Sequence, residues 1–211
     1  MTRPDAASAL GAILLAGGRA SRVGGAPKPL FDVGGRTLLA QAVAAVTDAG
    51  ARPITVAADV LDPGLAVGWV REEPPFGGPV AGTVAVLDAW AAADTLPEWT
   101  FVLACDLAHA PDAVARLAAD LALLPRDAEG ICLGDPSSRP QWLTGIYRTA
   151  ALRRAAAELP DRGRNAPVRA LVDDLAVTVV VVPGDLTDDI DTWEDLERAR
   201  TRAANPPEEA P

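Results

Sequence analysis

Three apolar segments of strand length constrain the fold of this chain more than any other feature. They lie at 11–16, 99–106 and 176–183, and each is apolar along most of its length. A strand that is apolar throughout is buried on both faces, whereas a strand with one face in water alternates apolar and polar residues. Segments with helical spacing separate these runs. The pattern predicts an α/β fold of three layers, with a mostly parallel central sheet and helices on both faces.

The remaining elements follow from hydrophobic spacing and turn residues. Further strands are expected at 53–58, 65–71, 129–134 and 141–148. Helices are expected at 36–50, 78–93, 111–124, 149–159, 165–174 and 192–204. No internal repeat or linker interrupts the 211 residues, so we expect one domain over 1–204 and a disordered tail at 205–211.

Composition disfavours several classes of protein. The formal net charge of −10 opposes binding to nucleic acid backbones and anionic membranes. Cys105 and Cys132 lie in apolar runs, which predicts buried free thiols rather than a disulfide or, with the single His109, a zinc site. No signal peptide and no run long enough to span a bilayer are visible. We therefore expect a cytoplasmic protein with neither nucleic acid nor membrane as a partner.

A loop rich in glycine and basic residues follows the first expected strand. Residues 13–30 read ILLAGGRASRVGGAPKPL. Ligands of open α/β sheets bind beyond the carboxyl ends of the strands, and glycines let backbone N–H groups approach phosphate oxygens. The glycine spacing matches neither the dinucleotide fingerprint nor the Walker A loop. From these residues alone, a phosphate site and a solvated surface loop both stay open.

Five segments together carry a resemblance to a known family. They are LLAGGRASRVGGAPKPL (14–30), REEPPFGGPVAG (71–82), LACDLAHAP (103–111), RPQWLTGIYR (139–148) and DIDTWEDLERA (189–199). In this order they resemble the motifs of nucleotidyltransferases, and most of all those of the molybdenum cofactor guanylyltransferases, a MobA-like family. The resemblance covers most of the chain.

That resemblance implies a Rossmann-like nucleotidyltransferase fold and an activity. The expected reaction transfers GMP from GTP to the molybdopterin cofactor and releases pyrophosphate. Mg²⁺ is the implied cofactor, because it takes oxygen ligands and bridges phosphates. GTP and molybdopterin are the implied small-molecule partners, with transient contacts to enzymes that make or receive the cofactor.

The resemblance also assigns roles to individual residues. Catalysis is expected from Arg22, Lys28 and Asp106, and metal binding from Asp106 and Asp191. The nucleotide is expected to contact Leu15, Ala16, Gly17, Gly18, Lys28, Asp59, Glu73, Gly78 and Asp106. The acceptor is expected to contact Arg139, Gln141 and Asp189. Glu73 would select guanine, because a carboxylate accepts hydrogen bonds from both N1–H and the exocyclic amino group.

Several of these residues have a second interpretation. Glu72 is placed as well as Glu73 for base recognition. Asp191 also fits the N-cap of the last helix, and Trp142 is expected in the core. Arg162 and Arg164 could contact an anion or lie in a solvated loop.

Departures from the family motifs leave the acceptor open. Pro27 precedes Lys28, as in some cytidylyl and uridylyl transferases, and Asp189 and Asp191 stand where the family has asparagines. The alternatives are a molybdopterin cytidylyltransferase, a sugar-phosphate nucleotidyltransferase, or a nucleotide-binding regulatory domain without turnover.

Overall fold

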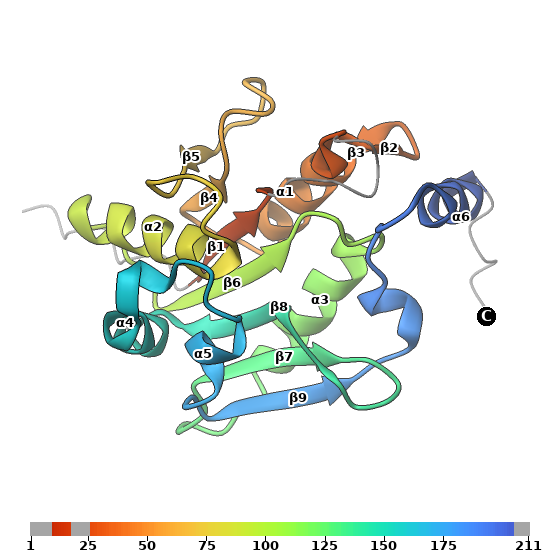
Figure 1. Ribbon diagram of the computed structural model, residues 1–211. Helices are drawn as coiled ribbons and strands as arrows, with labels where there is room; N and C mark the ends of the chain where they lie inside the picture. The colour runs from red at the N-terminus through yellow and green to blue at the C-terminus, as the bar shows by residue number, and fades with distance from the viewer. Residues whose placement is uncertain (1–9, 18–25, 205–211) are drawn as a thin grey trace, which may run out of the picture.

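A seven-stranded sheet forms the centre of the protein, as the computed structural model shows (Figure 1). The structure describes residues 10–17 and 26–204, so the expected tail at 205–211 lies outside it. The strands are β1 (Leu10–Leu15), β4 (Ile54–Ala57), β5 (Gly68–Val70), β6 (Trp99–Ala104), β7 (Gly130–Gly134), β8 (Pro140–Arg148) and β9 (Val177–Val181). Their order across the sheet is β5-β4-β1-β6-β8-β7-β9. Only β8 runs antiparallel to its neighbours within this sheet, which confirms the predicted, mostly parallel arrangement.

Helices cover both faces of the sheet. The helices are α1 (Leu38–Asp48), α2 (Pro79–Ala92), α3 (Ala110–Leu121), α4 (Thr149–Glu158), α5 (Arg169–Val172) and α6 (Trp193–Ala204). Buried side chains of α1 and α3 pack on one face of the sheet, and those of α2, α4 and α5 pack on the other. The three layers predicted from the sequence are confirmed. Among the described residues, no helix is both long and apolar enough to cross a membrane.

Strand β1 illustrates why its run is apolar throughout. Ala12 and Leu14 belong to the core on one face, whereas Ile13 between them belongs to the core on the other face. All three side chains are fully buried. The two cysteines also lie in these cores as free thiols, as expected. Burial raises the pKa of the Cys132 thiol to about 12, which keeps it protonated and unreactive at neutral pH.

A short hairpin precedes α1 where the sequence suggested helix from residue 36. Strands β2 (Asp32–Val33) and β3 (Arg36–Thr37) pair antiparallel across Gly34 and Gly35. Both glycines have positive φ, of 65° and 82°, as a two-residue hairpin turn requires. Thr37 then caps α1, its hydroxyl accepting a hydrogen bond from the backbone N–H of Ala40 at 3.1 Å.

A third small core fixes α6 beside this hairpin. Its buried side chains are Phe31, Val33, Leu38, Ile190, Leu196 and Ala199. The ring of Trp193 stacks on Phe31 with centroids 5.3 Å apart, and the Arg200 side chain donates to the carbonyl of Asp32 at 3.0 Å. Helix α6 is thereby held against residues 31–33.

Glu129 ties α4 to the segment before β9. One carboxylate oxygen accepts from the Arg154 side chain at 2.8 Å, and the other accepts from the backbone N–H of Ala176 at 3.3 Å. The hydrogen bond from Arg154 is the main cause that lowers the pKa of Glu129, while partial burial opposes it.

Glu129→Gln is therefore expected to reduce the free energy of unfolding by about 0.5–1 kcal/mol at pH 7. Because the folded-state pKa is lowered, the stabilisation is present above the pKa of an unfolded glutamate. It is lost as the pH falls through the lower folded-state pKa. Urea unfolding at pH 7 and at pH 3 measures this. A Gln variant with the same deficit at both pH values would contradict the expectation.

Candidate active site

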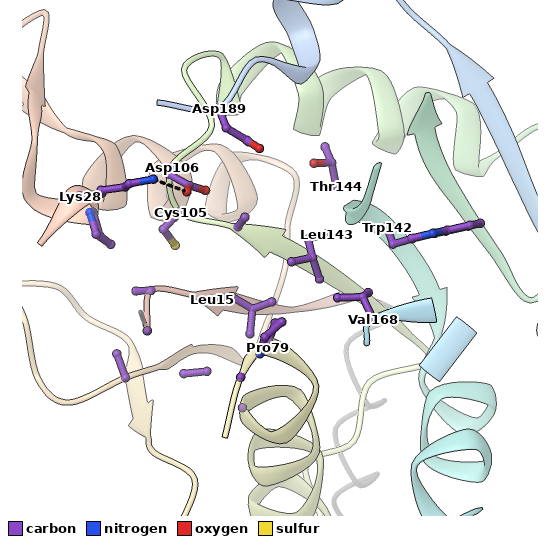
Figure 2. A pocket seen from close by; sticks show the side chains of 18 of the residues that line it. Leu15, Lys28, Pro79, Cys105, Asp106, Trp142, Leu143, Thr144, Val168 and Asp189 are labelled. Atoms are coloured by element: carbon purple, nitrogen blue, oxygen red, sulfur yellow. Dashed lines mark ion pairs between the residues drawn. The ribbon is translucent and has the colours of Figure 1, made fainter. Parts of the chain in front are cut away.

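A cavity of about 1080 Å³ opens beyond the carboxyl ends of β1, β4 and β6 (Figure 2). This is where open α/β sheets bind ligands. Residues singled out from the sequence that line it are Leu15, Ala16, Gly17, Lys28, Asp59, Gly78, Asp106, Arg139, Gln141, Asp189 and Asp191. Gly18 and Arg22 lie outside the described residues, so the structure does not place them. Gly17 and Lys28, from the two described ends of the glycine-rich loop, thus meet the end of β6 and residues 189–191 at one cavity.

Lys28 is held at the cavity by a short helical turn. The 3-10 turn Lys28–Leu30 begins after Pro27, and the N–H of Phe31 donates to the carbonyl of Lys28 at 2.9 Å. The Lys28 side chain is only 15% exposed, so it is not a solvated surface lysine. Its Nζ lies 2.6 Å from Oδ1 of Asp191 and 3.6 Å from Oδ2 of Asp106.

Lys28 is also the only lysine among the 211 residues, whereas the chain has 18 arginines. An ammonium is a compact charge on a flexible stem, but a guanidinium is a wide planar fork. A position between two carboxylates at 2.6 and 3.6 Å suits the smaller group. The presence of a single lysine is visible in the sequence, and it supports the assignment of Lys28 to the site.

Backbone pairing between distant segments brings the carboxylates together. The N–H of Ile190 donates to the carbonyl of Asp106 at 2.8 Å, and the N–H of Ala108 donates to the carbonyl of Asp188 at 3.0 Å. Residues 106–108 and 188–190 therefore run antiparallel side by side. Asp106, two residues beyond the end of β6, and Asp189 consequently face the same end of the cavity (Figure 2).

Asp191 does not cap α6 through its side chain. Thr192 does so, because its hydroxyl accepts from the N–H of Asp195 at 3.2 Å. In return the Asp195 carboxylate accepts from the N–H groups of Thr192 and Asp191, at 2.7 and 3.0 Å. This reciprocal capping leaves the Asp191 carboxylate beside Lys28. The alternative interpretation of Asp191 as the N-cap is wrong.

The carboxylates carry more negative charge than Lys28 neutralises. Burial raises the pKa of Asp106, and the nearby Lys28 ammonium partly opposes that rise. Asp189 faces the open cavity, but the surrounding wall desolvates its carboxyl and raises its pKa to about 7. The negative charges of Asp106 and Asp191 add to this rise. The site therefore favours a further cation.

The donor set fits magnesium bound together with a phosphate ligand. Within the described parts of the chain, no group of three or more His, Cys, Asp or Glu side chains is arranged to hold a metal ion by itself. Mg²⁺ in nucleotide sites commonly takes one or two carboxylates and completes its octahedron with phosphate oxygens and waters. Asp106 and Asp191 offer such oxygens, and both already lie close to one cation, the Lys28 ammonium.

The loop between β5 and α2 forms another part of the wall. Glu72 lines the cavity, and its carboxylate accepts from the N–H of Gly77 at 3.0 Å. Glu73 is exposed and is not among the lining residues. Base recognition by Glu73 stays a prediction, and its alternative Glu72 is the carboxylate that reaches the cavity wall. Gly78 precedes α2 as its N-cap with a φ of 91°, a conformation that favours glycine.

The two arginines with open interpretations both have protein partners. Arg162 forms an ion pair with Asp88. Arg164 donates to the carbonyl of Pro74 at 2.7 Å, and to that of Pro75 at 3.4 Å. Arg164 thereby binds the loop before α2.

A bulge in β8 shapes the opposite side of the cavity. The register changes from Gly145 opposite Cys132 to Gln141 opposite Leu133, so residues 142–144 have no partner in β7, although Thr144 still pairs with Leu103 of β6. Trp142 therefore lines the cavity and packs only partly against the core, which corrects the expected core position. Bulges re-aim side chains next to sites in this way.

The buried Tyr147 supports the bulge. Its hydroxyl donates to the carbonyl of Trp142 at 2.7 Å. Its ring fills the space above two glycines: a Cβ on Gly130 would lie 2.6 Å from the ring, and one on Gly145 would lie 2.7 Å from the hydroxyl. Tyr147 thus compensates for ladder hydrogen bonds that the bulge disrupts.

Tyr147→Phe is expected to lower the free energy of unfolding by about 1–2 kcal/mol, because the carbonyl of Trp142 loses its donor. Urea unfolding followed by circular dichroism measures the change. An unchanged midpoint would show that the bulge does not depend on this hydrogen bond. Thr201→Val is a control, since it removes another side chain-to-carbonyl bond at an exposed position of α6.

Some lining residues were not found by sequence reasoning. Arg71 and Phe76 lie within the segment 71–82 that carried one motif, so their position beside Glu72 was a usable signal. Asn165 and Val168 come from the connection between α4 and α5, where the sequence had drawn attention only to Arg162 and Arg164. Only the folded topology brings them to the cavity.

Comparisons with known proteins agree with this architecture. A family model described as the MobA-like NTP transferase domain matches residues 12–179. A protein of Opitutus terrae named as a probable molybdenum cofactor guanylyltransferase is 32% identical over 205 residues, covering 94% of this chain and 98% of that protein.

Solved structures share the fold at lower identity. Molybdopterin-guanine dinucleotide biosynthesis protein A from Archaeoglobus fulgidus has a TM-score of 0.66 at 16% identity, covering 92% of this chain and 98% of that one. The 2-C-methyl-D-erythritol 4-phosphate cytidylyltransferase from Thermus thermophilus has a TM-score of 0.60 at 22% identity, with the same coverage of 92% and 98%.

These two structures carry the argument for the nucleotidyltransferase fold, while the family model and the relative from Opitutus terrae identify the family. The match spans the sheet from β1 to β9 and includes the loop of Lys28 and the end of β6. The chain belongs to the MobA-like NTP transferase family.

Proposed function

We propose that this protein transfers GMP from GTP to the molybdopterin cofactor and releases pyrophosphate, with Mg²⁺ as its cofactor. The observation that carries the proposal is the cluster of Lys28, Asp106 and Asp191 at the end of β6, beside a cavity of about 1080 Å³. The Opitutus terrae relative, named as a probable molybdenum cofactor guanylyltransferase, supports the choice of donor and acceptor. A cytoplasmic location and transient contacts with enzymes of cofactor synthesis belong to the same proposal.

The reaction needs alignment and charge neutralisation rather than covalent catalysis. An oxygen of the acceptor phosphate attacks the α-phosphorus of GTP and forms a new P–O bond. The bond between the α-phosphorus and the oxygen bridging to the β-phosphate breaks, and pyrophosphate leaves with that electron pair. Negative charge accumulates on the phosphate oxygens during this step, so cations placed beside them lower the barrier.

Different residues of the site would bind the triphosphate, contact the nucleotide and hold the metal ion. Lys28 would hold the triphosphate by its positive charge, and the backbone of Ala16 and Gly17 would lie against the nucleotide. Asp106 and Asp191 would hold Mg²⁺, which when bound neutralises phosphate charge and aligns the two substrates.

The two substrates would occupy opposite parts of the cavity. Asp59, Glu72 and Gly78 come from the end of β4 and the loop before α2, where the base would bind. Arg139 and Gln141 come from the start of β8, where the acceptor would bind. In the sheet, β1 and β6 lie between β4 and β8, so the carboxylates at the end of β6 lie between the two substrates.

The direct test is pyrophosphate release from GTP, CTP, UTP and ATP, each with and without molybdopterin and Mg²⁺. We expect release only with GTP, molybdopterin and Mg²⁺ together. Turnover with CTP instead would support a cytidylyltransferase, the second candidate, which Pro27 before Lys28 favours. Nucleotide binding without turnover under any of these conditions would indicate a regulatory domain.

A further inference from the structure

We propose that Phe76 is a specificity residue of the nucleotide site, and that its ring stacks on the purine base. This inference rests on the proposed function, because it assigns one more contact to the nucleotide that the protein uses. Five large apolar residues stand out as exposed in the described chain: Val60, Phe76, Leu123, Val181 and Trp193. Of these, Phe76 alone lines the cavity, with 52% of its surface exposed.

The backbone of Phe76 is held in a conformation that bulky residues rarely adopt. Its φ is 62°, in the left-handed region. Such a conformation persists only where the surrounding structure fixes it, and residues of this kind cluster at ligand sites.

Contacts on both sides of Phe76 fix the loop. On the N-terminal side, Arg164 donates to the carbonyls of Pro74 and Pro75, at 2.7 and 3.4 Å. On the C-terminal side, the N–H of Gly77 donates to Glu72, and its carbonyl accepts from the N–H of Asn165 at 2.6 Å. Hydrogen bonds within the loop and to the connection between α4 and α5 therefore fix the backbone on both sides of the Phe76 ring.

The ring itself is oriented by a cation. The guanidinium of Arg71 lies over the Phe76 ring, 4.9 Å from its centroid. Arg71 also forms an ion pair with Asp59, which follows β4. Asp59, Arg71 and Phe76 therefore form a continuous row along the cavity wall. A cation over an aromatic face is a stabilising arrangement that fixes the ring plane.

The position of this row indicates the base rather than the acceptor. The row belongs to the β4 and β5 end of the sheet and to the loop before α2. The acceptor candidates Arg139 and Gln141 come with β8, which is separated from β4 by β1 and β6. Aromatic rings stack on any planar base, and a two-ring purine offers more area than a pyrimidine. Stacking on Phe76 therefore favours GTP over CTP. This preference adds to the one expected from a carboxylate that accepts hydrogen bonds from guanine.

The test is calorimetric titration of GTP and CTP, in Mg²⁺ and without acceptor, into the full-length protein and its variants. Phe76→Ala is expected to weaken GTP binding about tenfold and CTP binding less. Phe76→Trp is expected to retain tight GTP binding. In turnover, Phe76→Ala should raise the KM for GTP and leave kcat at saturating GTP within about twofold. Leu123→Ala is the matched control, since Leu123 is an exposed apolar residue outside the cavity lining.

Each outcome of the titration decides something. If the unaltered protein binds GTP and Phe76→Ala binds it equally well, the stacking role is wrong while the proposed function stands. If the unaltered protein binds no GTP, the proposed function fails and this inference fails with it. Circular dichroism identifies a Phe76→Ala protein that does not fold. In that case Phe76→Leu, which keeps an apolar side chain but no ring, gives the decision by the same comparison.

Discussion

Asp106→Asn is expected to lower kcat by at least about 10²- to 10³-fold while the protein stays folded. The change removes the negative charge that faces Lys28 and that would bind Mg²⁺, but it keeps the size of the side chain. Burial raises the pKa of the Asp106 carboxyl, so the charged form does not stabilise the fold. Removing the charge is therefore not expected to unfold the protein. The measurement is pyrophosphate release at saturating GTP, acceptor and Mg²⁺, with thermal unfolding followed in parallel.

Asp127→Asn is the matched control for this change, because Asp127 is exposed and does not line the cavity. Its turnover and its unfolding temperature should equal those of the unaltered protein. Full turnover by Asp106→Asn would remove the carboxylate at the end of β6 from the mechanism. A large drop in unfolding temperature would instead assign Asp106 a structural role.

Lys28→Met is expected to reduce kcat by about 10²- to 10³-fold. The neutral side chain has a similar length, so the change removes the charge and little volume. Lys28→Arg is expected to restore less than a tenth of the activity, although it restores the charge. The reason is geometric, since Nζ lies between Asp191 and Asp106 at 2.6 and 3.6 Å, where a planar guanidinium has no equivalent position.

Steady-state kinetics with varied GTP measure both Lys28 variants. Arg126→Met, at an exposed arginine that does not line the cavity, controls for the loss of a positive charge elsewhere. If Lys28→Arg were as active as the unaltered protein, any cation would serve at this position. The ion pairs with Asp106 and Asp191 would then not define the geometry of the site.

The central sheet could be predicted because its signal is local. Ile13 packs on one face of β1, and its neighbours Ala12 and Leu14 pack on the other, so the strand had to be apolar throughout. The direction of β8 and its bulge had no such signal. They depend on pairing with β6 and β7, which are distant in the sequence. Trp142 was misplaced for this reason.

The candidate site was predictable where one segment carries the information, and not where two segments must meet. The segment 13–30 admits a phosphate loop by itself and the other motifs of the resemblance favour it, while the end of β6 marks Asp106. For Asp191, the residues around it fit a helix cap as well as a ligand. Pairing of 188–190 with 106–108 places Asp191 at the cavity, and capping by Thr192 excludes the cap, while metal binding by Asp191 stays a prediction. Glu72 and Glu73 are adjacent in the sequence, and the conformation of the loop determines that Glu72 reaches the cavity wall.

The single lysine allows occupancy of the site to be followed by acylation of one side chain. Apart from the amino terminus, the chain has one primary amine, and that amine lies at the wall of the cavity between two carboxylates. Any reagent that acylates amines therefore labels one internal position. The rate of that labelling would follow how often the ion pairs of Lys28 open, and a bound triphosphate would slow it. Mass spectrometry of a mixture of acylated and unmodified protein could then measure occupancy of the site without a substituted residue or an attached dye.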